Sequence, residues 1–357
     1  MKIISLIRLT TVAGLAFALT GCSHLGPKTI TQDRFDYSST VAESWKQQTL
    51  LNIVKLRYLD LPVFLDVGQI VAGYSVETSG NIGGQISSAN AIQGNSLVLG
   101  AQGRFTDRPT ITYMPLTGDK FVRGLMEPIP PQSIFYMIQS GYAADFVLAL
   151  SVEAMNGLRN QGLSMGGQRP ADPEFIRAIQ LLRGLQLSGA VGLRVEKATN
   201  ALPATVLFFR KENLEPEIQK QIAEVKQLLR MESGEQRFRL LYSPVRGEPG
   251  ELAVQSRSVL QILFALASFI DVPAEHVKEQ RVLPSLDTPP DQWPIRVKFS
   301  KSKPADAYAA IAYRGGWYWI EDTDLKSKRA FGFIMFLFTL ADTGSGGNLP
   351  VLTIPTN

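Results

Sequence analysis

Apolar residues along this chain recur at both helical and strand spacing, which predicts helices and strands in irregular alternation. Residues 37–58 and 214–232 carry apolar side chains every three or four positions, as helices with one buried face do. The stretches "SRSVLQILFALASFIDVP" and "FGFIMFLFTLA" are almost wholly apolar and predict buried helices. Each apolar run is shorter than the roughly 20 residues that a helix needs to cross a bilayer.

Strand patterns lie between these helices. "AVGLRVEK" and "ATVLFFRK" predict paired strands, and "AYAAIAYRGGWYWIED" predicts a hairpin in which Gly315 and Gly316 supply the positive φ of the turn. "GLRNQGLSMGGQRPADP" is predicted to be a loop, followed by a helix that Asp172 caps. We therefore expect an α+β fold with a mixed or antiparallel sheet, β-hairpins and several amphipathic or buried helices.

The first residues form a separate pattern. "MKIISLIR" carries Lys2 and Arg8 and no acid, and an apolar run then ends in "LTGC". This stretch resembles the signal peptide and lipobox of bacterial lipoproteins, a family defined by its processing signal and not by its fold. The resemblance covers residues 1–23. It implies that diacylglycerol is attached to the sulfur of Cys22, that cleavage occurs before Cys22, and that the new amino terminus is acylated, with chains such as palmitate.

Such an anchor indicates where the protein works. Two or three acyl chains hold a protein durably on a membrane, whereas one does not. In lipoproteins, an Asp directly after the lipidated cysteine favours the inner membrane, and this chain has Ser23 there. The resemblance therefore implies an outer-membrane location, lipid-anchored and facing the periplasm.

The chain divides into four predicted parts. We expect a lipoprotein signal peptide, a polar tether, an α+β lobe that includes a glycine-rich hairpin at 73–105, and a second α+β lobe. Their predicted bounds are residues 1–21, 22–36, 37–200 and 201–357.

The glycine-rich hairpin is the most unusual segment in composition. Between residues 73 and 103 only Glu77 is charged, and alternating apolar residues predict two extended arms joined near Asn90. Three interpretations stay open. The segment is an exposed hairpin or low-complexity loop, an edge that binds a partner strand, or an arm like those that some oligomeric outer-membrane lipoproteins contribute to a shared transmembrane sheet.

Composition excludes several kinds of chemistry. Cys22 is the only cysteine, so once it carries lipid no thiol remains for disulfides, thiolate metal sites or cysteine nucleophiles. The only histidines are His24, beside the anchor, and His276. A net charge of +4 without basic clusters does not indicate a nucleic-acid binder. We expect no cofactor, no metal site and no nucleic-acid partner.

Few residues qualify as catalytic candidates. "GLSMG" matches G-x-S-x-G and makes Ser164 a candidate nucleophile, with His276 as its base and Asp271 or Asp287 to orient the histidine. The flanks predict a loop, whereas a true nucleophile elbow joins a strand to a helix. The structural interpretation of "GLSMG" is a chance match in a glycine-rich loop.

A second group of candidates lies near the end of the chain. Glu321, Asp322 and Asp324 could act as a carboxylate pair or hold calcium, but acids before an apolar helix are typical caps. Trp317 and Trp319 share one face of the predicted hairpin, where they form either a sugar-stacking platform or part of the core.

The sequence as a whole favours a protein that works by binding. We expect a lipid-anchored scaffold or accessory subunit of an envelope assembly such as an export or secretion machine. Its partners would be the membrane, other envelope proteins and further copies of itself. The alternative is a carboxylate- or serine-dependent hydrolase of cell-wall or surface polymer, using Ser164, His276 or Glu321.

Overall fold

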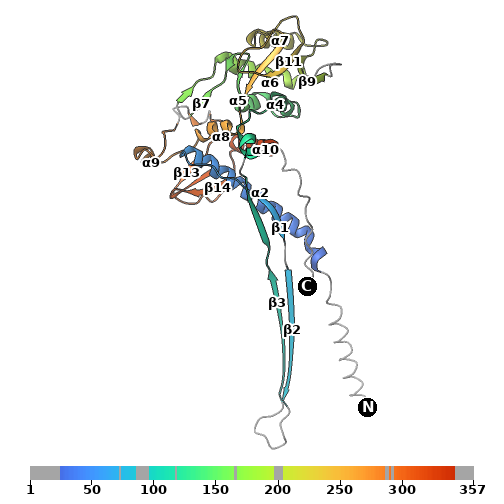
Figure 1. The fold of residues 1–357 in the computed structure, drawn as a ribbon, viewed down its shortest axis with the longest axis vertical. Helices are drawn as coiled ribbons and strands as arrows, with labels where there is room; N and C mark the ends of the chain where they lie inside the picture. The colour runs from blue at the N-terminus through green and yellow to red at the C-terminus, as the bar shows by residue number, and fades with distance from the viewer. Residues whose placement is uncertain are drawn as a thin grey trace, which may run out of the picture. The chain divides into compact units, whose positions relative to one another are not determined.

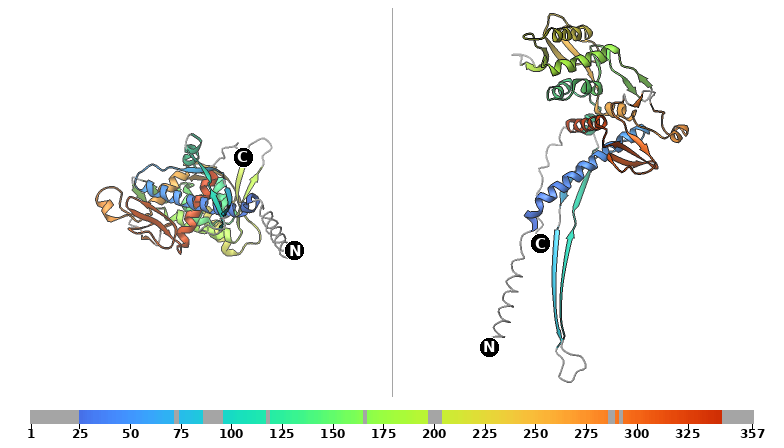
Figure 2. Two further views of the ribbon diagram at one scale, coloured as in Figure 1. Left: turned by 90° about the horizontal axis from the view of Figure 1, so that it is seen from below. Right: turned by 180° about the vertical axis from the view of Figure 1, so that it is seen from behind.

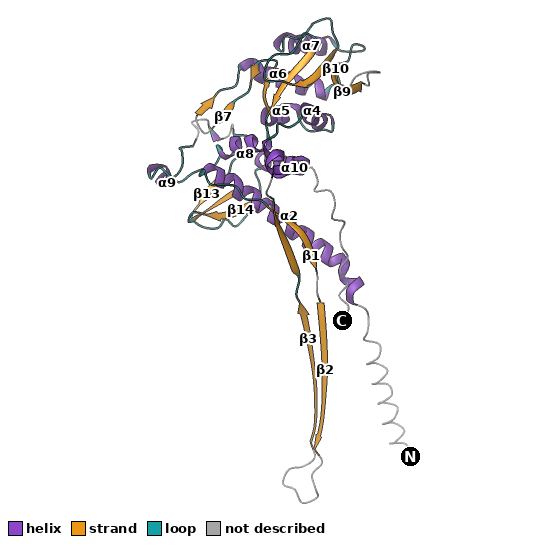
Figure 3. Cartoon of the chain, viewed as in Figure 1, coloured by secondary structure: helices purple, strands orange, loops and turns teal. Residues whose placement is uncertain are grey.

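The computed structural model describes residues 25–71, 74–85, 96–116, 119–164, 167–196, 204–285, 289–290 and 293–341. The chain forms two compact units, residues 1–49 and residues 50–357. Helix α2 (Leu25–Arg57) supplies the described residues of the first unit and the first residues of the second. Helices and several mixed or antiparallel sheets make up the second unit, which confirms the predicted α+β class (Figures 1 and 3).

Helix α2 begins earlier than the sequence pattern predicts. The sequence predicts a polar tether over residues 22–36, and residues 25–36 are helical. Pro27 does not prevent this, because it lies in the first turn, where its missing N–H has no helical partner to lose. A helix rises about 1.5 Å per residue, against about 3.3 Å for extended chain, so the helical part spans less than half the distance expected.

A mixed six-stranded sheet organises the second unit. It runs in the order β6 (Leu158–Arg159), β5 (Val152–Met155), β12 (Glu251–Ser256), β11 (Arg237–Tyr242), β10 (Ala204–Phe209), β9 (Val191–Glu196). Strands β11 and β12 are parallel, and all other neighbours are antiparallel. The predicted lobe boundary at residue 200 does not separate two lobes, because β9 pairs with β10 and β5 pairs with β12 across it.

Helices α4 (Pro131–Gln139), α5 (Ala144–Ser151) and α6 (Pro173–Leu187) pack on one another, and α7 (Pro216–Leu228) packs on α6. Helix α4 also contacts β9, β11 and β12 of the sheet. Asp172 occupies the position before α6 as predicted, but its carboxylate does not cap the helix. It accepts a 2.7 Å hydrogen bond from the Arg159 backbone N–H and so ties β6 to the start of α6.

The C-terminal part contains a smaller sheet, β13 (Lys298–Ser300), β15 (Gly316–Glu321) and β14 (Ala307–Tyr313), in that order. The predicted hairpin between β14 and β15 is present, but its two turn residues are Arg314 and Gly315, both with positive φ. Gly316 already pairs with Tyr313, and a β-carbon there would collide with the Phe299 ring. Glycine is therefore needed at position 316 for close packing against Phe299, and not for the turn.

The remaining helices are linked to this smaller sheet through α10. Helix α8 (Val259–Ala267) contacts α3 (Asp119–Met126) and α10 (Leu325–Ala341), and α10 contacts β15. The short helix α9 (Ala274–Lys278) follows α8 in the chain. One continuous hydrophobic cluster runs through the second unit, from Leu50 in α2 to Leu337 in α10.

Two antiparallel strand pairs form a long ribbon. β1 (Leu65–Val71) pairs with β4 (Thr110–Pro115), and β2 (Tyr74–Gln85) pairs with β3 (Ser96–Asp107) over twelve residues each. Val71 pairs with Thr110 and Tyr74 with Asp107, so the register continues from one ladder to the other, although β1 has a one-residue irregularity at Gly68. Figures 1 and 2 show β2 and β3 side by side along their whole length. The predicted hairpin within 73–105 is thus present as a ladder, and its joining segment near Asn90 lies outside the described residues.

The predicted loop at 157–173 contains further strands. β7 (Gly162–Ser164) pairs with β8 (Gly167–Arg169), and residues 158–159 already belong to β6. Between β5 and β6, Asn156 and Gly157 both have positive φ, as a two-residue hairpin turn requires.

The Asn156 side chain also links the β5–β6 turn to two other segments of the chain. It is buried, its Nδ2 donates to the carbonyl of Leu229 at 2.9 Å, and its Oδ1 accepts from the Ala253 N–H at 2.8 Å. An alanine at this position leaves both of those backbone groups buried without a partner.

We predict that Asn156→Ala lowers the free energy of unfolding by about 2 kcal/mol more than Asn213→Ala does. Asn213 is the matched control, because it also has positive φ but is exposed. Urea denaturation measures both variants. Equal losses would mean that backbone strain alone, and not the buried hydrogen bonds, determines the effect.

Candidate functional site

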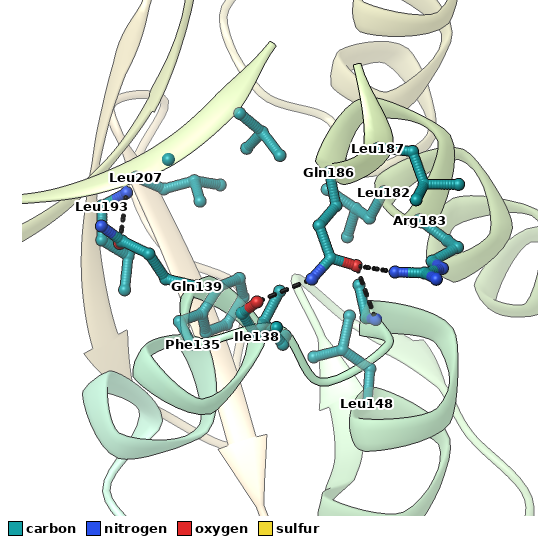
Figure 4. Close-up of a pocket in the computed structure, with 14 residues that line it drawn as sticks. Phe135, Ile138, Gln139, Leu148, Leu182, Arg183, Gln186, Leu187, Leu193 and Leu207 are labelled. Atoms are coloured by element: carbon teal, nitrogen blue, oxygen red, sulfur yellow. Dashed lines mark hydrogen bonds between the residues drawn. The ribbon is translucent and has the colours of Figure 1, made fainter. Parts of the chain in front are cut away.

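A cavity of about 420 Å³ lies between helices α4, α5 and α6 and strands β9 and β10 (Figure 4). Its volume falls within the range of about 300–1,000 Å³ that is typical of small-molecule pockets. Its buried wall consists of apolar side chains: Phe135, Ile138, Ala144, Leu148, Leu182 and Leu207. Gln139 and Leu187 are exposed and lie at its rim.

Gln186 of α6 fixes the polar part of this cavity. Its Nε2 donates to the carbonyl oxygens of Ile138 at 2.6 Å and Tyr142 at 2.7 Å. Its Oε1 accepts from the Ala144 N–H at 3.0 Å and from Nη1 of Arg183 at 2.6 Å. Both donors and both acceptor sites of the amide are therefore in use, and its position is set by α4 and α5.

Arg183 lines the same cavity one turn earlier on α6. Its half-buried guanidinium is held by the bond to Gln186, which is a neutral partner. Within the described part of the chain, no carboxylate lies within ion-pair distance of Arg183. The cavity thus combines apolar walls with one fixed positive charge that lacks a counter-ion among the described residues.

The rim carries a further polar contact. Gln139 at the end of α4 accepts a 3.1 Å hydrogen bond from the N–H of Leu193 through its Oε1. Leu193 belongs to β9, the last strand of the six-stranded sheet. Gln139 therefore occupies a backbone donor that would otherwise stand free at the sheet edge.

A second polar cluster joins the end of α2 to the smaller sheet. The Tyr58 hydroxyl lies 2.5 Å from the Tyr318 hydroxyl and 2.7 Å from Nδ1 of His276. Tyr58 and Tyr318 are buried, with 4% and 0% of their surfaces exposed. Beside them, Asp60 accepts hydrogen bonds from the Tyr313 hydroxyl and from Arg314, and the Arg314 guanidinium lies over the Tyr58 ring.

The charges in this cluster follow from its surroundings. Burial raises the pKa of Tyr58 and of Tyr318, so both hydroxyls stay protonated and able to donate. The hydrogen bond from Tyr313, followed by that from Arg314, lowers the pKa of Asp60 below its usual value. The cluster therefore consists of neutral tyrosines next to an ionised Asp60–Arg314 pair.

The structure shows the individual partners of the residues predicted for a hydrolase. Ser164 ends β7 and pairs with Gly167 of β8, so its backbone joins two strands, whereas an elbow joins a strand to a helix. His276 in α9 has its Nδ1 bonded to Tyr58. Asp271 pairs with Arg296 at 3.0 Å. Asp287, like Cys22, lies outside the described residues.

The acids near the C-terminus have structural partners. Asp324 precedes α10, and its carboxylate accepts from the N–H of Ser327 at 3.0 Å, which is the predicted capping role. Glu321 pairs with Lys298 at 2.5 Å, and Asp322 pairs with Lys328 at 2.8 Å.

The tryptophans of β15 lie half-buried under lysines. The Lys298 ammonium is 5.2 Å from the ring centre of Trp319, and Lys303 is 5.5 Å from that of Trp317. Tyr318 and Ile320, on the opposite face of the strand, are the ones that pack in the core. The face of β15 that carries the tryptophans is therefore only partly buried.

Sequence reasoning missed both the cavity and the tyrosine cluster. A signal for the cavity was present: Arg183 and Gln186 stand among the leucines of "LLRGLQL", of which Leu181, Leu182 and Leu185 are buried. The tyrosine cluster had no such signal, because Tyr58, His276 and Tyr318 are more than 40 residues apart in the chain.

Searches of known proteins add no identification. The chain matches no family model, no curated protein and no solved structure. Among the described residues, no helix is both long and apolar enough to span a bilayer. The same residues contain no cluster of three or more His, Cys, Asp or Glu side chains that could hold a metal ion.

We predict that Tyr58→Phe lowers the free energy of unfolding by about 1–3 kcal/mol, because it leaves the buried Tyr318 hydroxyl without its partner. Tyr136→Phe is the control, since Tyr136 is exposed on α4, and it should change stability by less than about 0.5 kcal/mol. Thermal and urea unfolding measure both. If the Tyr58→Phe protein is as stable as the control, the tyrosine cluster does not contribute to the stability of the fold.

The lowered pKa of Asp60 predicts a pH-dependent contribution to stability. The ionised carboxylate stabilises the folded state above its unfolded pKa of about 3.9, and this contribution disappears as pH falls towards the lower folded pKa. Because 39% of the Asp60 side chain is exposed, we expect Asp60→Asn to cost about 1 kcal/mol or less at pH 7.

Urea unfolding at pH 7, 5 and 3 measures this contribution. The difference between the parent protein and Asp60→Asn should be largest at pH 7 and small at pH 3. Asp306→Asn, at an exposed position, should differ little from the parent at every pH. A difference for Asp60→Asn that grows on acidification would contradict the assignment.

Proposed function

We propose that this protein is a lipid-anchored outer-membrane protein, facing the periplasm, that acts as a binding scaffold or accessory subunit of an envelope assembly such as an export or secretion machine. The anchor rests on the sequence around Cys22, which combines a basic start, an apolar run and the chain's only cysteine. The binding role rests on the two-stranded ribbon.

The exposure of strand β4 is the observation that carries the binding role. Every residue of β4 is exposed, including Ile111 at 40%, Tyr113 at 57% and Met114 at 47% of their surfaces. Ile111 and Tyr113 lie on one face of the strand, and contiguous exposed apolar surface is typical of sites of association. The strand also has only one partner, β1, so its other edge offers free backbone donors and acceptors within the described residues.

The β2–β3 ladder continues the ribbon in the same register as the adjoining end of β1 and β4. Its register pairs Val76 with Phe105 and Ile82 with Leu99, so apolar positions of both strands fall on one face. Glu77 pairs with Arg104, and beyond this pair towards the joining segment the sequence from 78 to 103 contains no charge. A charge-free amphipathic ribbon is suited to contact with an apolar surface.

The free edges indicate how such a ribbon would be bound. Added strands, from an envelope partner or from further copies of this chain, would satisfy the backbone groups of β2, β3 and β4. Both strands of the hairpin exceed the roughly 9–11 residues that a strand needs to cross a bilayer. Within lipid, partner strands on both edges would be obligatory, because unpaired backbone groups are excluded there.

The hydrolase alternative has less support. Ser164 joins two strands, His276 is bonded to Tyr58, and Glu321 is paired with Lys298. Each of these residues thus has a structural setting of its own, and no described geometry brings a nucleophile and a base together.

The proposal predicts that loss of the ribbon's exposed face abolishes assembly without unfolding the body. Cells producing each variant are crosslinked and extracted in mild detergent, and crosslinked complexes are identified by mass spectrometry. Ile111→Asp with Tyr113→Asp should lower recovered complexes at least about tenfold, since charges would enter an apolar interface. Thr110→Asp with Thr112→Asp, on the other face of the same strand, is the matched control and should stay within about twofold.

Two further variants separate the anchor from the ribbon. Deletion of residues 75–102 should leave the protein folded and on the membrane but without complexes. Cys22→Ala should release the protein from the membrane fraction. If the deletion gives the same complexes and phenotype as the parent, the ribbon is not the binding element; if Cys22→Ala stays membrane-bound, the anchor is not at Cys22.

A further inference from the structure

We propose that the cavity between α4, α5, α6 and the β9–β10 strands binds a single-chain fatty acid, with the ligand's carboxylate paired to the guanidinium of Arg183. The apolar side chains of the cavity take the hydrocarbon chain. This site is independent of the ribbon and of the lipid anchor.

The walls match an aliphatic chain. Phe135, Leu148 and Leu182 are each less than 5% exposed and present apolar surface to the cavity, and Leu207 faces them from β10. Figure 4 shows these side chains around the space, with Leu187 near Leu182 and Gln186. A hydrocarbon chain that enters the cavity removes its own apolar surface from water, and this burial favours binding.

The polar end of the cavity matches a carboxylate. Arg183 spends one of its five N–H donors on Gln186, and in the described part of the protein no acid neutralises its charge. Gln186 cannot rotate away without breaking its bonds to α4 and α5, so it holds the guanidinium in place. A planar guanidinium fixed beside an apolar cavity is suited to bind a carboxylate through two parallel hydrogen bonds.

The rim favours a fatty acid over the carboxyl terminus of a peptide. A bound peptide would extend over β9 and pair with its free edge, as added strands do. At Leu193 that edge is already closed, because the N–H donates to Gln139. A fatty acid needs only the apolar wall and the cation, and both are available without displacing Gln139.

The test uses the full-length protein in a nonionic maltoside detergent and a dodecanoic acid that carries a diazirine near its methyl end. After irradiation, mass spectrometry locates the label. We expect it on the residues that line the cavity, and we expect unlabelled dodecanoate to compete for it. The same probe with an alcohol in place of the carboxyl group should label these residues at least about tenfold less.

Matched variants isolate the charge. Arg183→Gln should lower cavity labelling at least about tenfold, while Arg177→Gln, on the same helix but paired with Glu224, should leave it unchanged. Leu187→Glu adds a negative charge at the exposed rim, one turn from Arg183, and should lower labelling at least about fivefold; Leu187→Gln should not. Because Leu187 is 71% exposed, this pair remains informative even if Arg183→Gln fails to fold.

Three results would overturn the assignment. They are labelling spread over the whole surface, equal labelling by the acid and the alcohol, and equal labelling of the Leu187→Glu and Leu187→Gln proteins. Stronger competition by a short peptide with a free carboxyl-terminal leucine than by dodecanoate would assign the site to a peptide instead. A protein lacking residues 75–102 should label normally, so failure of the ribbon proposal and failure of this one are separable.

Discussion

Backbone groups at the edge of a β-sheet need partners, and this constraint organises the whole structure. In the six-stranded sheet, one edge N–H of each outer strand has a partner within the body: that of Leu193 in β9 donates to Gln139, and that of Arg159 in β6 donates to Asp172. The ribbon of β1–β4 and β2–β3 does not meet it within the described residues, because each strand has one partner only. The ribbon strands β2 and β3, with twelve residues each, therefore carry the longest free edges among the described strands, and they belong to the part for which we propose a binding role.

The sequence predicts local features well and long-range ones poorly. Alternation in "GYSVETSG" and "NSLVLGAQG" is enough to predict the β2–β3 hairpin, because strand period and antiparallel register are local properties. The same reasoning predicts the β14–β15 hairpin and the capping by Asp324. It misplaces the division of the body at residue 200, because the pairing of β5 with β12 joins segments about a hundred residues apart and leaves no local trace.

One feature that the predicted pattern missed has a clear local signal in the sequence. Asn156-Gly157 is a strong two-residue turn signal, and it forms the β5–β6 hairpin at the start of the segment that the sequence pattern predicts to be a loop. The tyrosine cluster is different in kind. Tyr58, His276 and Tyr318 meet only because α2, α9 and β15 converge, so no spacing in the sequence predicts it. The sequence "LLRGLQL" contains the polar residues of the candidate site. It does not predict the cavity that they line.

A comparison of two arginines explains why one is structural and the other is a candidate for binding. Arg257 is buried and fully engaged: it pairs with Glu153 at 2.9 Å and donates to backbone carbonyls of Leu150 and Gln161. A buried cation with this set of acceptors is stable without a ligand. Arg183 has apolar neighbours and one neutral amide instead. Its charge is balanced by no described residue, and an anionic ligand would supply what Glu153 supplies to Arg257.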